Sequence, residues 1–207
     1  MIEAYTGTPG SGKTYHAVYD IWNALKYGRP VISNIPLNLP NKYLGKKDYE
    51  WKNWRFEETY NITPQMLYNV SHNIQEQKGF KRVPEDYILL VIDEAQLVFN
   101  CRDWQSAGRQ MWLSFFQQHR KLGYHVILVT QMSKMLDRHM QGLLEYEIVH
   151  RKFSNFGWRG WLVSLMMFSP TMFSAMRVWA CMNTRIDAKV FRYSRRIAKL
   201  YDTSRTY

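Results

Sequence analysis

Eight consecutive residues near the start of the chain have the composition and spacing of a phosphate-binding loop. The pattern G-x-x-x-x-G-K-[ST] is matched at every fixed position by Gly7, Thr8, Pro9, Gly10, Ser11, Gly12, Lys13 and Thr14. In such a loop the glycines let backbone N–H groups surround the β-phosphate, while the lysine reaches the β- and γ-oxygens and the threonine hydroxyl binds Mg²⁺. The run therefore predicts that Lys13 and Thr14 bind a nucleoside triphosphate with its metal ion. The alternative is a glycine-rich turn before an ordinary helix.

The segments on either side of this loop fit the strand and the helix that a phosphate loop joins. Residues 2–5 have the character of a short strand, and Tyr15, Val18, Ile21 and Leu25 recur at helical spacing before Gly28. The loop thus leads into a helix N-terminus, where unsatisfied N–H groups and the positive end of the helix dipole bind anions.

Two carboxylates follow a second predicted strand. Residues 87–92 form a continuous apolar run of the kind found in buried parallel strands, and Asp93 and Glu94 come directly after it. Asp93 can hold Mg²⁺ through water, and Glu94 can orient and deprotonate an attacking water molecule. This pair predicts a triphosphate-hydrolysing enzyme rather than a kinase. The alternative is that the two charges merely end a strand.

A polar pair follows a third predicted strand, residues 125–129. Thr130 and Gln131 would lie beside the carboxylates if the two strands are neighbours in a parallel sheet. Gln131 is therefore a candidate sensor of the γ-phosphate, with Thr130 behind it. The alternative is a glutamine that bonds to its own turn.

The order and wording of these motifs resemble the zonula occludens toxin family of phage proteins. The similar segments are GTPGSGKTYHAV, GRPVISNIPLN, VIDEAQ and HRKLGYHVILVTQ, within about residues 1–150. The resemblance implies a P-loop ATPase related to FtsK/HerA-type DNA translocases and phage packaging ATPases, with ATP and Mg²⁺ bound at the boundaries of a ring of subunits. It also implies an arginine supplied by the neighbouring subunit. Arg120 matches the family's position, with Arg109 and Arg138 as weaker candidates; a solvated helix face is the alternative for Arg120.

Hydrophobic periodicity predicts an α/β fold with a doubly wound, mostly parallel sheet of at least five strands. The resemblance implies that this sheet is of the RecA/FtsK-like P-loop NTPase type. Further strands are expected at 30–35 and 144–151, and helices at 64–77 and 104–122. We expect residues 1–150 to form the nucleotide-binding core, with an insertion at about 41–86. In that insertion Trp51 and Trp54 are expected to anchor on the core, although stacking on nucleic-acid bases is the alternative.

The C-terminal part of the chain, residues 151–207, is expected to be a basic extension packed on the core. Strands are predicted at 161–168 and 176–182, joined by a turn at Pro170, followed by a basic helix. The net charge of +11 arises entirely beyond residue 100: residues 1–100 hold 11 Lys and Arg against 11 Asp and Glu, and residues 101–207 hold 17 against 6. In the predicted basic helix the cations recur at helical spacing and would line one face: Lys189, Arg192, Arg195, Arg196 and Lys199. Such a face could bind DNA without reading its sequence. An ordinary solvated face, or an acidic protein partner, is the alternative.

Other features of the sequence bear on localisation and on metal binding. No run reaches the 18 consecutive apolar residues of a membrane span, and no signal peptide is expected because the residues after Met1 enter the fold at once. We therefore expect a protein of the host cytoplasm or of the virion. A peripheral membrane contact through a hairpin at 161–182 is the minority interpretation. The two cysteines and six histidines show neither disulfide nor metal-ligand spacing.

Together these features predict an ATP-hydrolysing motor that moves DNA during phage assembly. The short chain without a span favours packaging of the genome into a preformed capsid over extrusion of a filamentous virion. A third possibility is a structural subunit, gated by ATP, of a capsid vertex or membrane complex. Capsid vertex or membrane assembly proteins are the expected protein partners.

Overall fold

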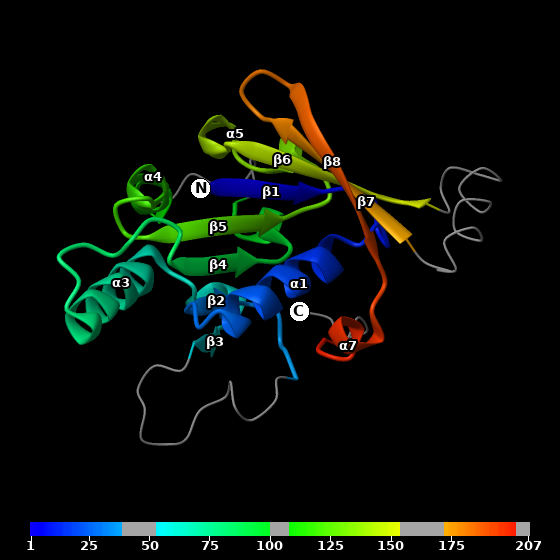
Figure 1. Ribbon diagram of the computed structural model, residues 1–207. Helices are drawn as coiled ribbons and strands as arrows, with labels where there is room; N and C mark the ends of the chain where they lie inside the picture. Colours follow the sequence, from blue (N-terminus) through cyan, green and yellow to red (C-terminus); the bar gives the residue numbers. More distant parts are fainter. Residues whose placement is uncertain (39–52, 100–107, 154–171, 202–207) are drawn as a thin grey trace.

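Figure 1 shows the computed structural model of the chain, which describes residues 1–38, 53–99, 108–153 and 172–201. The predicted strand at 161–168, Pro170, Trp51, Trp104 and Cys101 lie outside the described residues.

An eight-stranded sheet forms the centre of the molecule, with strand order β3-β2-β4-β5-β1-β6-β7-β8. The pairings from β3 to β6 are parallel, whereas β6, β7 and β8 pair antiparallel. This confirms the predicted mostly parallel sheet with an added C-terminal strand pair. The strands are β1 (Ile2–Thr6), β2 (Val31–Ser33), β3 (Trp54–Phe56), β4 (Ile88–Ile92), β5 (Tyr124–Val129), β6 (Tyr146–Lys152), β7 (Met172–Trp179) and β8 (Thr184–Arg192).

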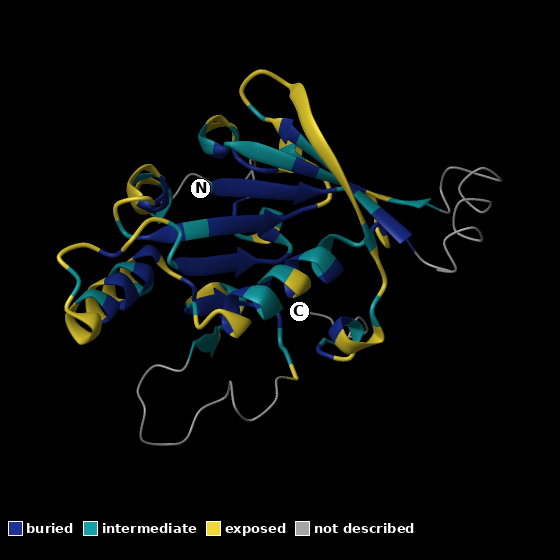
Figure 2. Ribbon diagram, in the orientation of Figure 1, coloured by how far each residue is buried: buried dark blue, intermediate teal, exposed yellow. Residues whose placement is uncertain are grey.

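Helices cover both faces of the sheet, so the fold is doubly wound. On one face α1 (Lys13–Lys26) and the short α7 (Arg195–Ala198) pack near each other, and on the other lie α3 (Pro64–Lys78), α4 (Gly108–Gln118) and α5 (Arg138–Leu143). Successive side chains of a strand point to opposite faces. Leu89 and Val91 of β4 therefore join the core beneath α1, while Ile88, Leu90 and Ile92 join the core beneath α3, α4 and α5. Figure 2 shows the resulting buried central strands.

The parallel strands bring the predicted functional residues to one edge of the sheet. β5 pairs with β1 on one side and with β4 on the other, so the carboxyl ends of all three lie side by side. The phosphate loop follows β1, Asp93 follows β4 and Thr130 follows β5. The topology alone therefore places the three motifs together.

Several boundaries agree with the local signals in the sequence. Thr63 caps α3 by accepting a hydrogen bond from the Met66 amide at 3.3 Å. α1 ends just before Gly28, whose φ of +71° favours glycine. The described connections also contain single turns of 3₁₀ helix: η1 (Thr59–Asn61), η2 (Ala95–Leu97) and η3 (Ser133–Met135).

The bounds of the second C-terminal strand were wrong: the strand expected at 176–182 is β7, which begins at Met172 and ends at Trp179. The chain then reverses through a turn in which Asn183 has a φ of +51° and forms β8, which pairs with β7 on the side away from β6. The basic helix expected across Lys189 to Lys199 is also wrong: Lys189 and Arg192 belong to β8, and α7 has four residues. Pairing of β8 with β7 over its length outweighs the three-to-four spacing of the cations.

Two further features concern the predicted domain division. β6 continues through residue 150, and β7 and β8 extend the same sheet, so the predicted boundary at 150/151 falls within a strand. In the predicted insertion, Trp54 lies on β3 and packs, half-buried, against the core beneath α1. Within the described residues, no helix has the length and apolar character that a bilayer crossing requires.

Candidate nucleotide-binding site

The phosphate loop lies between the end of β1 and the start of α1, with the added strands directly against it. A Cβ atom on Gly7, whose φ is +141°, would lie 2.4 Å from the carbonyl oxygen of His150 on β6. A Cβ atom on Gly12, whose φ is +93°, would lie 2.7 Å from the ring of Phe173 on β7. Glycine is therefore required at both positions for conformation and for space.

The polar groups inside the loop fit an anion. The Lys13 ammonium donates hydrogen bonds to the carbonyl oxygens of Gly7 at 2.9 Å and Thr8 at 3.2 Å, which folds it over the loop. Burial lowers the pKa of Lys13. The Ser11 hydroxyl is buried and has no hydrogen-bond partner among the described residues. An orphaned hydroxyl among amides at a helix N-terminus is an environment that accepts a phosphate group.

Thr14 and Asp93 meet across the site. The Thr14 hydroxyl donates a hydrogen bond to Asp93 Oδ2 at 3.1 Å, although 79 residues separate them in sequence. Asp93 is 4% exposed, and this burial raises the pKa of its carboxyl to about 6. A hydroxyl and a carboxylate at this distance are suitable oxygen ligands, or partners of bound water, for Mg²⁺. The chemistry of this donor pair fits a magnesium nucleotide.

Asn34 fixes the backbone of Asp93, and sequence reasoning did not assign it a role. Its side-chain amide donates to the Asp93 carbonyl oxygen at 2.9 Å, and its oxygen accepts from the Asp93 amide at 2.7 Å. The same amide group also contacts Thr59 Oγ1 at 2.9 Å. Asn34 follows β2, the neighbour of β4, so a polar residue at that strand end was the available signal.

Glu94 occupies a special backbone position next to Asp93. Its φ of +50° and ψ of +44° place it in the left-handed region, which is uncommon for a residue with a side chain. Its amide donates to Asp93 Oδ1 at 3.0 Å, and its carboxylate accepts a hydrogen bond from the Gln96 amide group. The Glu94 side chain is half-buried, so water can reach it. An accessible carboxylate beside the buried Asp93 is suited to act on water.

Gln131 lies against the loop through its backbone. Its carbonyl oxygen accepts a hydrogen bond from the Gly7 amide at 3.1 Å, and its exposed side chain lines a hollow of about 680 Å³ together with Thr8 and Pro9. Thr130 behind it is fully buried. The position of Gln131 is compatible with the predicted sensor, and that role stays a prediction.

The three candidate arginines lie away from the loop of their own chain. Arg120 forms an ion pair of 2.6 Å with Glu145, which also bonds to the Ile2 amide at the amino end of β1, opposite the phosphate loop. Arg109 pairs with Asp137 at 3.3 Å, and Arg138 lines a separate hollow beside α4 and α5. Any role of Arg120 would therefore concern a neighbouring subunit, and it stays a prediction.

His119, adjacent to Arg120, is a buried residue whose Nδ1 lies 2.6 Å from the Phe116 carbonyl oxygen. The His119 side chain therefore lies at the edge of the core. On α4, Met111 is 53% exposed, whereas Trp112, Phe115 and Phe116 form the buried face.

Relatives found by sequence are phage proteins. The Gene 1 protein of Enterobacteria phage fd is 29% identical over 152 residues, which cover 70% of this chain and 40% of that protein. ORF301 of Pseudomonas phage Pf3, whose name assigns it to assembly, is 26% identical over 150 residues, covering 72% of this chain and 42% of that protein. The chain thus spans about 40% of the length of these relatives.

Solved structures show the same fold. The N-terminal domain of zonular occludens toxin from Neisseria meningitidis superimposes with a TM-score of 0.57 and 20% identity, covering 97% of this chain and 98% of that one. The genome packaging NTPase B204 from Sulfolobus turreted icosahedral virus 2, in complex with ATP-gammaS, gives a TM-score of 0.55 and 17% identity, covering 92% of this chain and 96% of that one. These likenesses concern the fold alone.

The family described as Zonular occludens toxin (Zot) matches residues 1–206, a range that includes the phosphate loop, Asp93 and both antiparallel strands. Motifs, fold and family match agree, and the chain belongs to the zonular occludens toxin (Zot) family.

Proposed function

We propose that this chain is a Mg²⁺-dependent ATPase that drives the assembly and extrusion of a filamentous-type phage. The observation that carries the proposal is the 3.1 Å contact between the Thr14 hydroxyl and Asp93, next to the phosphate loop. The structure of B204 with ATP-gammaS supports ATP as the nucleotide.

Each site residue has a proposed role that follows from its chemistry. Lys13 binds the β- and γ-phosphates, Thr14 and Asp93 hold the metal, Glu94 orients and deprotonates the attacking water, and Gln131 senses the γ-phosphate. When bound, Mg²⁺ would neutralise charge on the phosphate oxygens. The positive φ of Glu94 directs the chain away from β4 immediately after the carboxylate pair, which supports a dedicated position for this residue.

The relatives favour extrusion of a filamentous virion. The short sequence without a predicted membrane span had instead suggested genome packaging. Gene 1 proteins of filamentous phages are related by sequence, whereas the packaging NTPase B204 shares the fold at 17% identity. Because the chain covers about 40% of the length of the gene 1 proteins, the absence of a membrane-crossing helix among the described residues does not distinguish the two settings.

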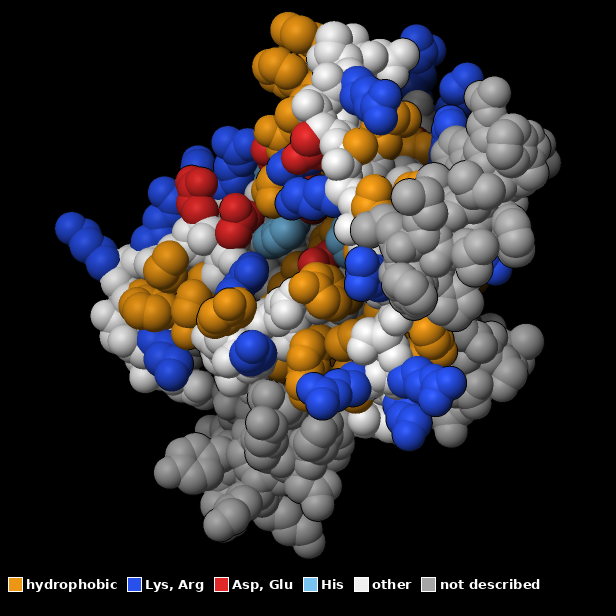
Figure 3. Space-filling model, turned by 45° about the vertical axis from the view of Figure 1, so that its right-hand side comes forward, with side chains coloured by type: hydrophobic (Ala, Val, Ile, Leu, Met, Phe, Trp, Pro, Cys, Tyr) orange, Lys and Arg blue, Asp and Glu red, His pale blue; other side chains and the backbone are white. Residues whose placement is uncertain are grey.

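DNA is the proposed partner of the basic C-terminal strands and helix. Exposed cations continue from β8 into α7: Arg185, Lys189, Arg192, Arg195, Arg196 and Lys199. In Figure 3, Lys and Arg side chains are visible along the lower rim of the molecule, toward α7. Such a surface can contact phosphates without reading bases. A ring of subunits, in which the neighbour's Arg120 completes the site, is proposed from the family resemblance.

ATP turnover with Mg²⁺, measured with and without duplex DNA, tests the proposal. We expect wild-type turnover to rise on adding DNA and Lys13→Ala to lower it by about a hundredfold or more, since a charged group at the phosphates is lost. Lys26→Ala is the matched control, because Lys26 is an exposed lysine in the last turn of the same helix. Binding of ATP without any turnover would instead favour a structural subunit gated by the nucleotide.

A further inference from the structure

Two histidines connect the two ends of the phosphate loop. His150 on β6 is 1% exposed, and its Nδ1 lies 3.2 Å from the carbonyl oxygen of Thr6, the last residue of β1. Its Nε2 lies 2.8 Å from Nδ1 of His16, in the first turn of α1. The loop begins after Thr6 and ends at the start of α1. The two rings therefore join the entry and the exit of the loop through β6.

The hydrogen-bond partners determine where the protons of this pair must be. A carbonyl oxygen only accepts, so Nδ1 of His150 carries the proton and donates to Thr6. Burial lowers the pKa of His150 to about 3, which leaves its Nε2 as an unprotonated acceptor near neutral pH. His16 must then donate to it from Nδ1. The contacts thus specify a proton on Nδ1 of each ring.

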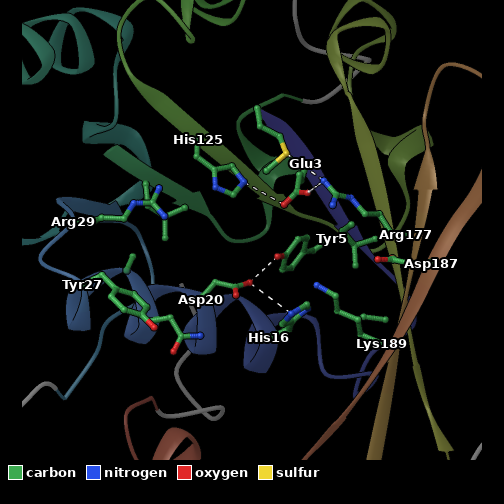
Figure 4. A pocket seen from close by; sticks show the side chains of 16 residues that line it. Glu3, Tyr5, His16, Asp20, Tyr27, Arg29, His125, Arg177, Asp187 and Lys189 are labelled. Carbon is green, nitrogen blue, oxygen red and sulfur yellow. Dashed lines mark hydrogen bonds and ion pairs between the residues drawn. The ribbon is translucent and has the colours of Figure 1, made fainter. Parts of the chain in front are cut away.

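His16 is itself held from several sides. Its ring stacks on Tyr5 with a centroid distance of 5.0 Å and on Phe191 of β8 with 4.8 Å. Its Nε2 lies 3.7 Å from Asp20, one turn further along α1, and Asp20 accepts a 2.7 Å hydrogen bond from the Tyr5 hydroxyl. Figure 4 shows Tyr5, His16 and Asp20 among the side chains that line a cavity of about 370 Å³.

Charged groups from the neighbouring strands line the rest of this cavity. Glu3 of β1 is paired with His125 of β5 at 3.2 Å and with Arg177 of β7 at 3.1 Å, and Lys189 of β8 extends toward His16. His16 therefore has little freedom to leave its position, because the groups around it are paired or packed.

We propose that His150 and His16 are positioning residues that hold the entry and the exit of the phosphate loop at a fixed separation, so that the loop is preorganised for the triphosphate. This inference rests on the proposed function of the loop as the ATP site. It also gives β6 and the added strands a function: His150 from β6, Phe173 from β7 and Phe191 from β8 form the support behind the loop.

Three substitutions of His150 separate its two hydrogen bonds. His150→Phe retains an aromatic ring and removes both bonds. His150→Asn keeps a donor near the Nδ1 position and loses the contact with His16, while His150→Gln keeps an acceptor near the Nε2 position and loses the contact with Thr6. His119→Phe is the matched control, because His119 is a buried histidine that bonds to a backbone carbonyl at the opposite edge of the sheet.

We expect His150→Phe to raise the KM for ATP roughly tenfold or more, since a small displacement of binding groups is costly. The turnover number at saturating ATP should change by less than about threefold, because Asp93 and Glu94 are untouched. The Asn and Gln variants should fall between wild type and Phe. A wild-type KM for His150→Phe, or an equal rise in KM for His119→Phe, would overturn the proposal.

A second measurement does not depend on any variant folding. Long-range ¹H–¹⁵N NMR spectra of the nucleotide-free wild type should show His150 as the neutral Nδ1–H tautomer between pH 6 and 8. Finding the Nε2–H tautomer or a charged ring would contradict the arrangement. Failure of the proposed function looks different: the wild type would then not turn over Mg-ATP, whereas failure of this inference leaves wild-type turnover intact and the KM of His150→Phe unchanged.

Discussion

Asp93 combines deep burial with a negative charge that the nearby Lys13 ammonium offsets only in part in the free protein. Its partners are the Thr14 hydroxyl and the Glu94 amide, both neutral, while the nearby Glu94 carboxylate disfavours ionisation. Such a carboxylate is costly to ionise until a cation arrives. The site therefore holds unfavourable free energy that metal binding can relieve.

The stability of the nucleotide-free protein should depend on pH through Asp93. Because the pKa is raised from 3.8 to about 6 in the folded state, the folded protein binds this proton more tightly than the unfolded chain. Its contribution to stability is present below pH 4 and is lost as the pH rises through 6. We expect Asp93→Asn to raise the free energy of unfolding by about 3 kcal/mol at pH 8 and by little at pH 4. Denaturant unfolding at both pH values measures this, and an equal gain at both would disprove the assignment.

Glu94→Gln should separate nucleotide binding from hydrolysis. The amide keeps the size of the side chain but cannot take a proton from water, so we expect ATP to bind with wild-type affinity and turnover to fall at least roughly a hundredfold. Equilibrium binding and single-turnover hydrolysis measure the two steps. Glu76→Gln, a change at an exposed position on α3, is the control. Normal turnover by Glu94→Gln would mean that another group activates the water.

At the scale of elements, the end of β2 organises the end of β4. Asn34 satisfies both backbone polar groups of Asp93, which are buried between the two strands. An unpaired buried backbone group costs about 1–3 kcal/mol. The position of Asp93, the proposed metal ligand, therefore depends on a residue that follows a neighbouring strand.

Asn34→Ala should lower both stability and turnover. We expect a loss of about 2–4 kcal/mol in the free energy of unfolding, since two backbone groups lose their partner. We also expect slower turnover, since Asp93 is no longer fixed. Asn69→Ala, at an exposed position on α3, should change stability by less than about 0.5 kcal/mol. Thermal and denaturant unfolding give the comparison, and similar losses for the two variants would contradict the role of Asn34.

The sequence predicted the parts of the site whose residues are contiguous, and it missed those that tertiary structure brings together. Local sequence patterns at a strand end predict both the loop and the pair Asp93-Glu94. Asn34 reaches Asp93 across 59 residues, and His150 reaches Thr6 across 144. The same limit explains the wrong basic helix: cations at three-to-four spacing also occur on a strand, and the decisive pairing with β7 is non-local.

At the scale of the whole molecule, charge is divided between the two halves of the chain. The half that carries the phosphate loop, Asp93 and Glu94 has no net charge, and the excess of cations belongs to the half that contains β6, β7, β8 and α7. The proposed ATP hydrolysis and the proposed DNA binding therefore belong to different parts of one sheet. In the proposed function, hydrolysis would act on the proposed DNA-binding surface through β6 and β7, because His150 of β6 and Phe173 of β7 lie against the loop.

Binding to duplex DNA should be non-specific and strongly dependent on salt. We expect the combined change of Arg192, Arg195 and Arg196 to Glu to weaken binding and to reduce the slope of log affinity against log salt by about 0.9 for each phosphate contact that is lost. The control reverses Lys78 and Lys81, exposed cations in the neutral half of the chain. Fluorescence anisotropy over a salt series provides the slopes. If both variants lost the same DNA affinity, the net charge of the protein alone would explain the binding, and the proposed surface would not.

The exposed rim of the sheet affects how the protein behaves when it is concentrated. Among the described strands, β8 has a neighbour on one side only, and it runs for nine residues with Ile186 and Val190 about half exposed. An unpaired strand of this kind invites pairing with another copy, and like charges such as Arg185 and Lys189 keep two copies apart. Added salt screens that repulsion. Raising the ionic strength to strip nucleic acid from the purified protein should therefore also promote its aggregation, and dilution should reverse the early stages.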